Sequence, residues 1–207
     1  MEFETTHVSD VYNQISSHFN KTRGYNWSWI TDFIDTLPHG SNVLDIGCGN
    51  GRNMQYPNHN FIGIDNSVKF LKICEEQGLR ALYADMTYIP IRSDSQDAIM
   101  CIASFHHLST ENRRLDALHE MKRIVKSNGK ILISVWSKEQ PAKTRRTFDK
   151  YGDTIVTWNN NIGQIYNRYY YIFKIEEIRK LFIQNGFVIE SHVWDCGNEV
   201  FVLRPKN

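Results

Sequence analysis

The stretch Asn42-Val43-Leu44-Asp45-Ile46-Gly47-Cys48-Gly49-Asn50-Gly51 decides the fold of this 207-residue chain. Its apolar run from Val43 to Ile46 predicts a buried strand, and the three glycines at alternate positions predict a tight turn that leads into a helix. Glycine has no Cβ, so such a turn lets the backbone approach a ligand closely. We expect a binding loop here, although many nucleotide-binding folds contain a Gly-x-Gly-x-Gly loop.

Two further acids follow this loop at intervals of twenty residues. Phe61-Ile62-Gly63-Ile64-Asp65 predicts a second strand that ends in an acid, and Asp85 follows a third predicted strand over 79–84. In an open parallel sheet the C-terminal ends of the strands line one crevice, so Asp45, Asp65 and Asp85 should all lie there. Asp65 stands where the hydroxyls of a ribose would need an acceptor.

This arrangement resembles the class I S-adenosylmethionine (SAM)-dependent methyltransferases, which implies SAM as cofactor. In that superfamily the glycine loop meets the methionine, the acid of the second strand holds the ribose, and the acid of the third reaches the adenine. A NAD or FAD site is the competing interpretation, but its fingerprint is Gly-x-Gly-x-x-Gly, whereas this chain has its third glycine at Gly51. The expected cofactor-binding residues are Tyr12, Asp45, Gly47, Gly49, Asn50, Asp65, Asn66, Asp85, Met86 and Ala103.

Strand and helix patterns alternate along the remainder of the chain. Helices are expected over 7–37 (with a turn near 21–24), 67–77, 111–126 and 174–185, and further strands over 97–103, 130–136, 187–194 and 199–203. We therefore expect one domain over 1–207, an α/β fold with a mostly parallel, Rossmann-like, seven-stranded sheet and helices on both faces. Residues 1–40 should form helices over the site. Residues 137–170 show little periodicity and are expected to be an irregular substrate-binding insertion.

The composition suits a globular protein and argues against a disordered or membrane-spanning one. The chain is 41% hydrophobic and has a net charge of +1, which suits a globular protein and requires any RNA contact to come from local patches or a partner. Its four cysteines lack Cys-x-x-Cys spacing, so we expect reduced thiols and no metal site. No membrane-length apolar run or secretory signal is visible, and a cytoplasmic location, with a nuclear fraction possible, is expected.

Four segments outside the glycine loop narrow the function. They are Val11-Tyr12-Asn13-Gln14-Ile15 with Arg23 and Trp27 beyond it, Ser104-Phe105-His106-His107-Leu108, Trp136 with Glu139-Gln140, and Tyr166-Asn167-Arg168-Tyr169-Tyr170. These segments resemble the eukaryotic tRNA methyltransferases that esterify 5-carboxymethyluridine at the wobble position. Two departures stand out: Tyr171 replaces a histidine usual in that family, and the polar insertion before it is reduced to about 157–165.

The acceptor that this resemblance implies needs little activation. A carboxylate is already ionised at neutral pH and can attack a methyl group directly, so the enzyme must align it and exclude water. Arg23 is expected to clamp the carboxylate or a nearby phosphate, the alternative being a solvated loop arginine. His106 and His107 are the other candidate catalytic residues, with a structural role as the alternative for each.

The resemblance also implies contacts with the anticodon loop of tRNA. The candidate RNA-binding residues are Lys143, Arg145, Arg146, Trp158, Arg168 and Tyr169, cations for phosphates and aromatic faces for unstacked bases. A solvated charged surface is the alternative.

The predicted strand over 79–84 should be an edge of the sheet, and an apolar edge invites another chain. The family resemblance implies that a small zinc-binding methyltransferase activator subunit covers it at Leu82 and Tyr83. Two other functions stay open at this point: a methyltransferase for a small molecule such as a quinone or lipid precursor, and a non-catalytic subunit with the SAM fold.

Overall fold

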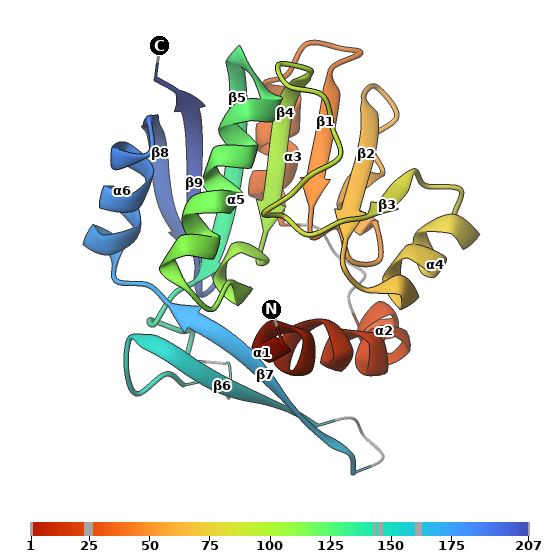
Figure 1. Ribbon diagram of the computed structural model, residues 1–207, viewed down its shortest axis with the longest axis vertical. Helices are drawn as coiled ribbons and strands as arrows, with labels where there is room; N and C mark the ends of the chain where they lie inside the picture. Colours follow the sequence, from red (N-terminus) through yellow and green to blue (C-terminus); the bar gives the residue numbers. More distant parts are fainter. Residues whose placement is uncertain (1, 23–26, 143, 145–146, 160–162, 207) are drawn as a thin grey trace.

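The computed structural model describes residues 2–22, 27–142, 144, 147–159 and 163–206, and it is built on a seven-stranded sheet (Figure 1). The strand order is β3-β2-β1-β4-β5-β9-β8, in which the first five strands run parallel. β9 is antiparallel to both of its neighbours, β5 and β8, so β8 runs in the same direction as the first five strands. The strands are β1 (Asn42–Ile46), β2 (Asn60–Asp65), β3 (Ala81–Tyr83), β4 (Gln96–Ile102), β5 (Val125–Trp136), β8 (Phe187–Asp195) and β9 (Asn198–Pro205). The prediction of a mostly parallel seven-stranded sheet is confirmed.

Helices cover both faces of this sheet, as expected. On one face α3 (Ser28–Asp35) packs its apolar stripe, including Ile30 and Phe33, against Val43 and Met100. On the other face α5 (Glu111–Ile124) packs against the central strands, and α6 (Ile175–Gln184) packs against β8 and β9. The shorter α4 (Val68–Glu76) lies beside β2 and β3. Because β1 is central and covered on both sides, its apolar residues are completely buried, which explains the continuous apolar run in the sequence.

The N-terminal segment lies across the C-terminal ends of the strands (Figure 1). It consists of α1 (Glu2–Glu4), a π-helical turn over Thr5–Ser9 and α2 (Asp10–Thr22). The helical structure thus begins five residues before the predicted start at residue 7. The extra turns carry Glu4, whose buried carboxylate is held by partners in the body of the protein.

The expectation that residues 137–170 are irregular was wrong over its second half. β6 (Gly152–Asn159) and β7 (Ile165–Ile172) form a separate two-stranded antiparallel sheet, with Val156 opposite Arg168. Burial alternates along β6, which is the period of two expected of a strand with one packed face. The β-branched and aromatic run from Thr154 to Trp158 was the signal for this strand, and the charged residues before it obscured the pattern.

Two short 3₁₀ turns, Arg52–Met54 and Phe105–His107, follow β1 and β4 and carry residues toward the crevice. Within the described part of the chain, no helix combines the length and apolar character needed to cross a bilayer.

Candidate active site

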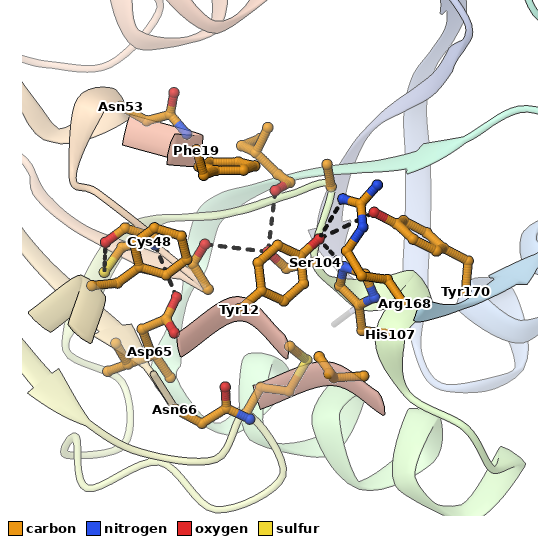
Figure 2. Close-up of a pocket in the computed structure, with 18 of the residues that line it drawn as sticks. Tyr12, Phe19, Cys48, Asn53, Asp65, Asn66, Ser104, His107, Arg168 and Tyr170 are labelled. Atoms are coloured by element: carbon orange, nitrogen blue, oxygen red, sulfur yellow. Dashed lines mark hydrogen bonds between the residues drawn. The ribbon is translucent and has the colours of Figure 1, made fainter. Parts of the chain in front are cut away.

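A cavity of about 320 Å³ opens at the C-terminal ends of β1 to β5, beneath the N-terminal helix (Figure 2). Its walls come from the glycine loop, from the ends of the parallel strands, from α2 and from β7. The residues predicted from the sequence that line it are Tyr12, Gly47, Gly49, Asn50, Asp65, Asn66, Asp85, Met86, Ala103, His107 and Arg168. One crevice therefore brings together predicted residues from Tyr12 near the N-terminus to Arg168 near the end of the chain.

The glycine loop forms the floor of this cavity. Gly47 has φ +71°, and a Cβ there would lie 2.2 Å from the Oγ of Ser104, so only glycine fits. Gly49 has φ +54°, and a Cβ on it would meet no atom within 4 Å. Its N–H donates to Oδ2 of Asp65 at 2.9 Å, which ties the loop to the end of β2. The loop is thus held open beside space that a ligand can occupy.

Two acids, the completely buried Asp45 and the half-buried Asp65, make this floor a site for a cationic ligand. Burial raises the pKa of Asp45 to about 7, with a further contribution from nearby Asp65, whose own pKa burial raises to about 6. Asp45 is completely buried and does not line the cavity, and neither of its carboxylate oxygens has a hydrogen-bond partner among the described residues. A ligand that carries positive charge and hydroxyl groups could contact Asp65 directly and would be attracted by the negative charge of Asp45. SAM carries a sulfonium, an ammonium and two ribose hydroxyls, so the residues fit it.

An ion-pair network forms the wall near β3. Arg113 donates from Nη2 to Asp85 at 2.6 Å and from Nε to Glu4 at 2.8 Å. Glu4 also accepts from the N–H and hydroxyl of Ser109. Although burial raises the pKa of Asp85, hydrogen bonds from Thr87 and Arg113 outweigh that effect and lower it. This network fastens the N-terminal segment over the cavity and keeps Asp85 ionised.

The opposite wall centres on the hydroxyl of Tyr12, around which His107, Tyr170 and Arg168 gather (Figure 2). Nδ1 of His107 lies 2.7 Å from the carbonyl oxygen of Tyr169 and must donate to it, which leaves Nε2 to accept from the Tyr12 hydroxyl at 3.0 Å. Tyr12 has then used its proton, so Tyr170 and Nη1 of Arg168 both donate to its oxygen, at 3.1 and 3.4 Å. The wall is a network of hydrogen bonds that meets at the Tyr12 hydroxyl.

His107 is neutral in this arrangement. Burial lowers its pKa to about 3, and the nearby charge of Arg168 adds to that effect despite the opposing hydrogen bond to Tyr169. The other predicted histidine, His106, does not line the cavity; its Nδ1 accepts from the N–H of Trp136, and it is fully buried. His107 is therefore the histidine that an acceptor in the cavity could reach.

The remaining predicted residues lie elsewhere. Trp158 packs against His18, Phe19 and Arg168 at the rim, outside the lining. Tyr169 is buried with its hydroxyl on Asp153 at 2.6 Å, so its ring presents no free face to a base. Arg23, Lys143, Arg145 and Arg146 lie outside the described residues.

Sequence reasoning missed several residues of the site, namely Glu4, Phe19, Phe70, Ser104 and Trp136 as lining residues and the pairing of Arg113. The apolar ones continue helical stripes or strand ends, a pattern that burial in the core explains equally well. Glu4 gave no signal, because its partners are more than 100 positions away. Among the described residues, no cluster of three or more histidine, cysteine or acidic side chains could hold a metal ion.

Comparison with known proteins agrees with this geometry. A family model described as a methyltransferase domain matches residues 44–133. The chain is 35% identical over 231 residues to a tRNA (carboxymethyluridine(34)-5-O)-methyltransferase of Schizosaccharomyces pombe, covering 100% of this chain and 99% of that protein. It is 43% identical over 148 residues to the mouse tRNA (carboxymethyluridine(34)-5-O)-methyltransferase ALKBH8, covering 71% of this chain.

The chain spans only 22% of the length of that mouse relative. Among solved structures, the fold is similar to that of an S-adenosylmethionine-dependent methyltransferase from Clostridium acetobutylicum, with a TM-score of 0.70 and 15% identity over 95% of this chain and 99% of that one. The similarity to this structure shows the class I SAM methyltransferase fold.

Proposed function

Since the chain belongs to the tRNA (carboxymethyluridine(34)-5-O)-methyltransferase family, we propose that it methylates the carboxylate of 5-carboxymethyluridine at the wobble position of tRNA. The donor is SAM, and the product is the 5-methoxycarbonylmethyl ester. Such an enzyme would work on mature tRNA in the cytoplasm.

When bound, SAM supplies a methyl group made electrophilic by the sulfonium sulfur. A carboxylate oxygen of the acceptor forms the new C–O bond, while the broken C–S bond leaves its electron pair on sulfur. No proton is taken or released, since the carboxylate is ionised before it binds. The protein therefore has to hold the two reactants in line and keep water away.

One observation carries this proposal: among the described residues that line the cavity, no histidine or carboxylate is free to act as a general base. His107 is neutral, with one nitrogen on a carbonyl and the other on Tyr12. Glu4 and Asp85 are paired with Arg113, and Asp65 accepts two backbone N–H groups. A hydroxyl or ammonium acceptor would need a base to take its proton, whereas a carboxylate needs none.

The residues divide into three roles under this proposal. Asp65 and the backbone of the glycine loop hold the ribose and methionine parts of SAM, Asp45 supplies negative charge behind them, and Asp85 with Met86 borders the adenine. Tyr12 and His107 are positioning residues that fix the shape of the acceptor wall. Arg23, which lies outside the described residues, stays a candidate for a contact to the acceptor carboxylate or to a phosphate.

Nucleoside mass spectrometry of tRNA tests the proposal. After incubation with SAM, tRNA that carries 5-carboxymethyluridine should gain the methyl ester, and tRNA with unmodified wobble uridine should gain nothing. An Asp65→Ala chain should be inactive on both, because the ribose acceptor is lost. Methylation at another nucleoside, or none even with an activator subunit present, would contradict the proposed function.

We also propose that residues 137–170 contact the anticodon loop. The β6–β7 hairpin extends away from the main sheet (Figure 1), and its side chains Ile155 and Ile165 are exposed. Lys150 is exposed beside it, and Lys138 lies over the ring of Tyr151 at 5.2 Å. Charge reversal of Lys138 and Lys150 together should weaken tRNA binding and reduce its dependence on salt.

The open edge of β3 is the surface proposed for a zinc-binding activator subunit. Among the strands of the described residues, β3 pairs with β2 alone, and its side chains Leu82 and Tyr83 are 41% and 65% exposed. An unpaired edge with apolar side chains can accept a strand from another chain. Co-expression with such a subunit should raise the yield of soluble, active protein, and Tyr83→Asp should remove that gain.

A further inference from the structure

Arg168 is a buried cation that has no carboxylate partner among the described residues. The residue is 3% exposed, lines the cavity and stands on β7, directly opposite Val156 of β6. Its one hydrogen bond to another described residue goes from Nη1 to the hydroxyl of Tyr12, at a long 3.4 Å. Nε is buried and has no partner among the described residues. Within that part of the chain, no carboxylate forms an ion pair with it.

Aromatic rings hold the guanidinium in place instead. Its central carbon lies 4.7 Å from the ring centre of Trp158, 5.3 Å from that of Tyr170, and 5.8 Å from those of both Tyr12 and Trp136. Ring faces attract a cation but leave its N–H groups without acceptors. These four rings, which we call the aromatic box, therefore fix the orientation of the guanidinium. Most of its N–H groups have no acceptor among the described residues.

Two neighbouring arginines, Arg113 and Arg114, are satisfied by protein partners. Arg113 has two carboxylate partners, Glu4 and Asp85. Arg114 donates to the carbonyl of Leu108 and lies 3.9 Å over the ring of Tyr171. A buried charge that lacks its counter-ion is costly, so its retention beside a cavity points to an anion that arrives with a ligand.

We propose that the guanidinium of Arg168 binds the carboxylate of the acceptor's carboxymethyl group. This inference rests on the proposed function and names the side chain that recognises the substrate. The planar fork of arginine matches the two oxygens of a carboxylate, and the fixed ring box removes much of the entropy cost of orienting it. The same fork could hold an RNA phosphate, so the experiment must separate the two anions.

The contact has a consequence for the product. The carboxylate loses its charge as the ester forms, so Arg168 stabilises the bound acceptor more than it stabilises the transition state. Its loss should therefore raise KM more than it lowers kcat. The neutral ester no longer pairs with Arg168, which favours release of the product.

Competition binding with anticodon stem-loops tests this assignment. Four stem-loops differ only at the wobble base: 5-carboxymethyluridine, its neutral carbamoylmethyl analogue, its methyl ester and plain uridine. Each is titrated against the full chain saturated with S-adenosylhomocysteine, as wild type, Arg168→Met, Arg168→Lys and a matched control, Arg179→Met. Arg179 is exposed on α6 and does not line the cavity.

Wild type and Arg179→Met should bind the carboxymethyl stem-loop about 10- to 100-fold more tightly than the carbamoylmethyl one. Arg168→Met should bind all four stem-loops alike, with unchanged affinity for S-adenosylhomocysteine. Arg168→Lys should retain part of the preference, because it keeps the charge but loses the fork. If Arg168→Met does not fold, two results still test the assignment. They are the tighter binding of the carboxymethyl stem-loop by the wild type and the smaller preference for it in Arg168→Lys.

Two results would overturn the inference. One is a wild type that binds the carboxymethyl and carbamoylmethyl stem-loops equally. The other is an Arg168→Met or Arg168→Lys chain that binds every stem-loop more weakly but keeps the full preference, as expected for a phosphate contact. Failure of the proposed function would look different, because the wild type would then transfer no methyl group to the carboxymethyl stem-loop.

Discussion

The two ends of the cavity hold the same side chain in opposite settings. Near β3, Arg113 is paired with Glu4 and Asp85, which closes the N-terminal segment over the site. Across the sheet, near β5, Arg168 sits among four rings without a carboxylate from the described residues. The first arginine completes the fold, and the second is left with binding capacity that only a ligand can use.

This difference separates stability from recognition. Removing Arg113 leaves two carboxylates without their cation, so it should lower the free energy of unfolding. Removing Arg168 leaves no carboxylate of the described residues unpaired, so it should weaken ligand binding instead. Substitution of Arg113 and of Arg168 tests this separation at the two ends. Substitution of His107 probes the acceptor wall, and substitution of Asp45 probes the floor.

The largest effect is expected from neutralising the two arginines in turn. Arg113→Met leaves Glu4 and Asp85 without their cation, and the free energy of unfolding should fall by about 2 to 3 kcal/mol, mainly through Glu4, because solvent screens the 37% exposed side chain of Asp85. Arg168→Met should change it by less than about 1 kcal/mol, because methionine fills an aromatic box well and no charge loses its partner. Urea unfolding of both variants measures the two values.

The double variant Glu4→Gln, Arg113→Met is the control for the first end, since it removes most of the stranded charge and should recover part of the stability. Equal losses in Arg113→Met and Arg168→Met would break the comparison.

A second, smaller effect concerns His107 on the acceptor wall. Burial lowers its pKa to about 3, whereas the unfolded imidazole has a pKa near 6.5. Between these values the unfolded state binds the proton and the folded state does not, so this group makes stability fall as the pH falls. From pH 6.5 to 5 the loss is about 2 kcal/mol. The measurement is urea unfolding of wild type and His107→Asn across this range.

The acids Asp45 and Asp65 act in the opposite direction, because their pKa values are raised in the folded protein and protonation there stabilises it. The difference between wild type and His107→Asn isolates the histidine. A difference that stays constant from pH 6.5 to 5 would show that His107 is not held neutral.

The smallest effect is expected in the pH dependence of SAM binding at the floor. Asp45 and Asp65 have pKa values of about 7 and about 6, and a cationic ligand prefers both ionised. Affinity for SAM should therefore rise with pH, by about tenfold between pH 6 and 8. Asp45→Asn should bind more weakly at pH 8 and show a flatter profile by isothermal titration calorimetry. An unchanged profile in Asp45→Asn would place its carboxylate outside the ligand's influence.

Much of the fold and of the cofactor side of the site was predictable from local patterns. The run from Val43 to Gly51 predicted a buried strand and a glycine loop, and both are present. Asp65 ends β2 and lines the cavity as expected, while Asp85 lies two residues beyond the short β3. Asp45 was predicted in the crevice, but it is completely buried within β1 and does not line the cavity.

The acceptor side depends on contacts that no local pattern records. The sequence by itself determined where strands end and where glycine is required, because those features follow from periodicity and backbone sterics within a few residues. Only the tertiary structure decided that Glu4 meets Arg113, and that Arg168 lies among rings from α2, β5, β6 and β7. Whether a charge is neutralised depends on its neighbours in space, and these neighbours come from distant parts of the chain.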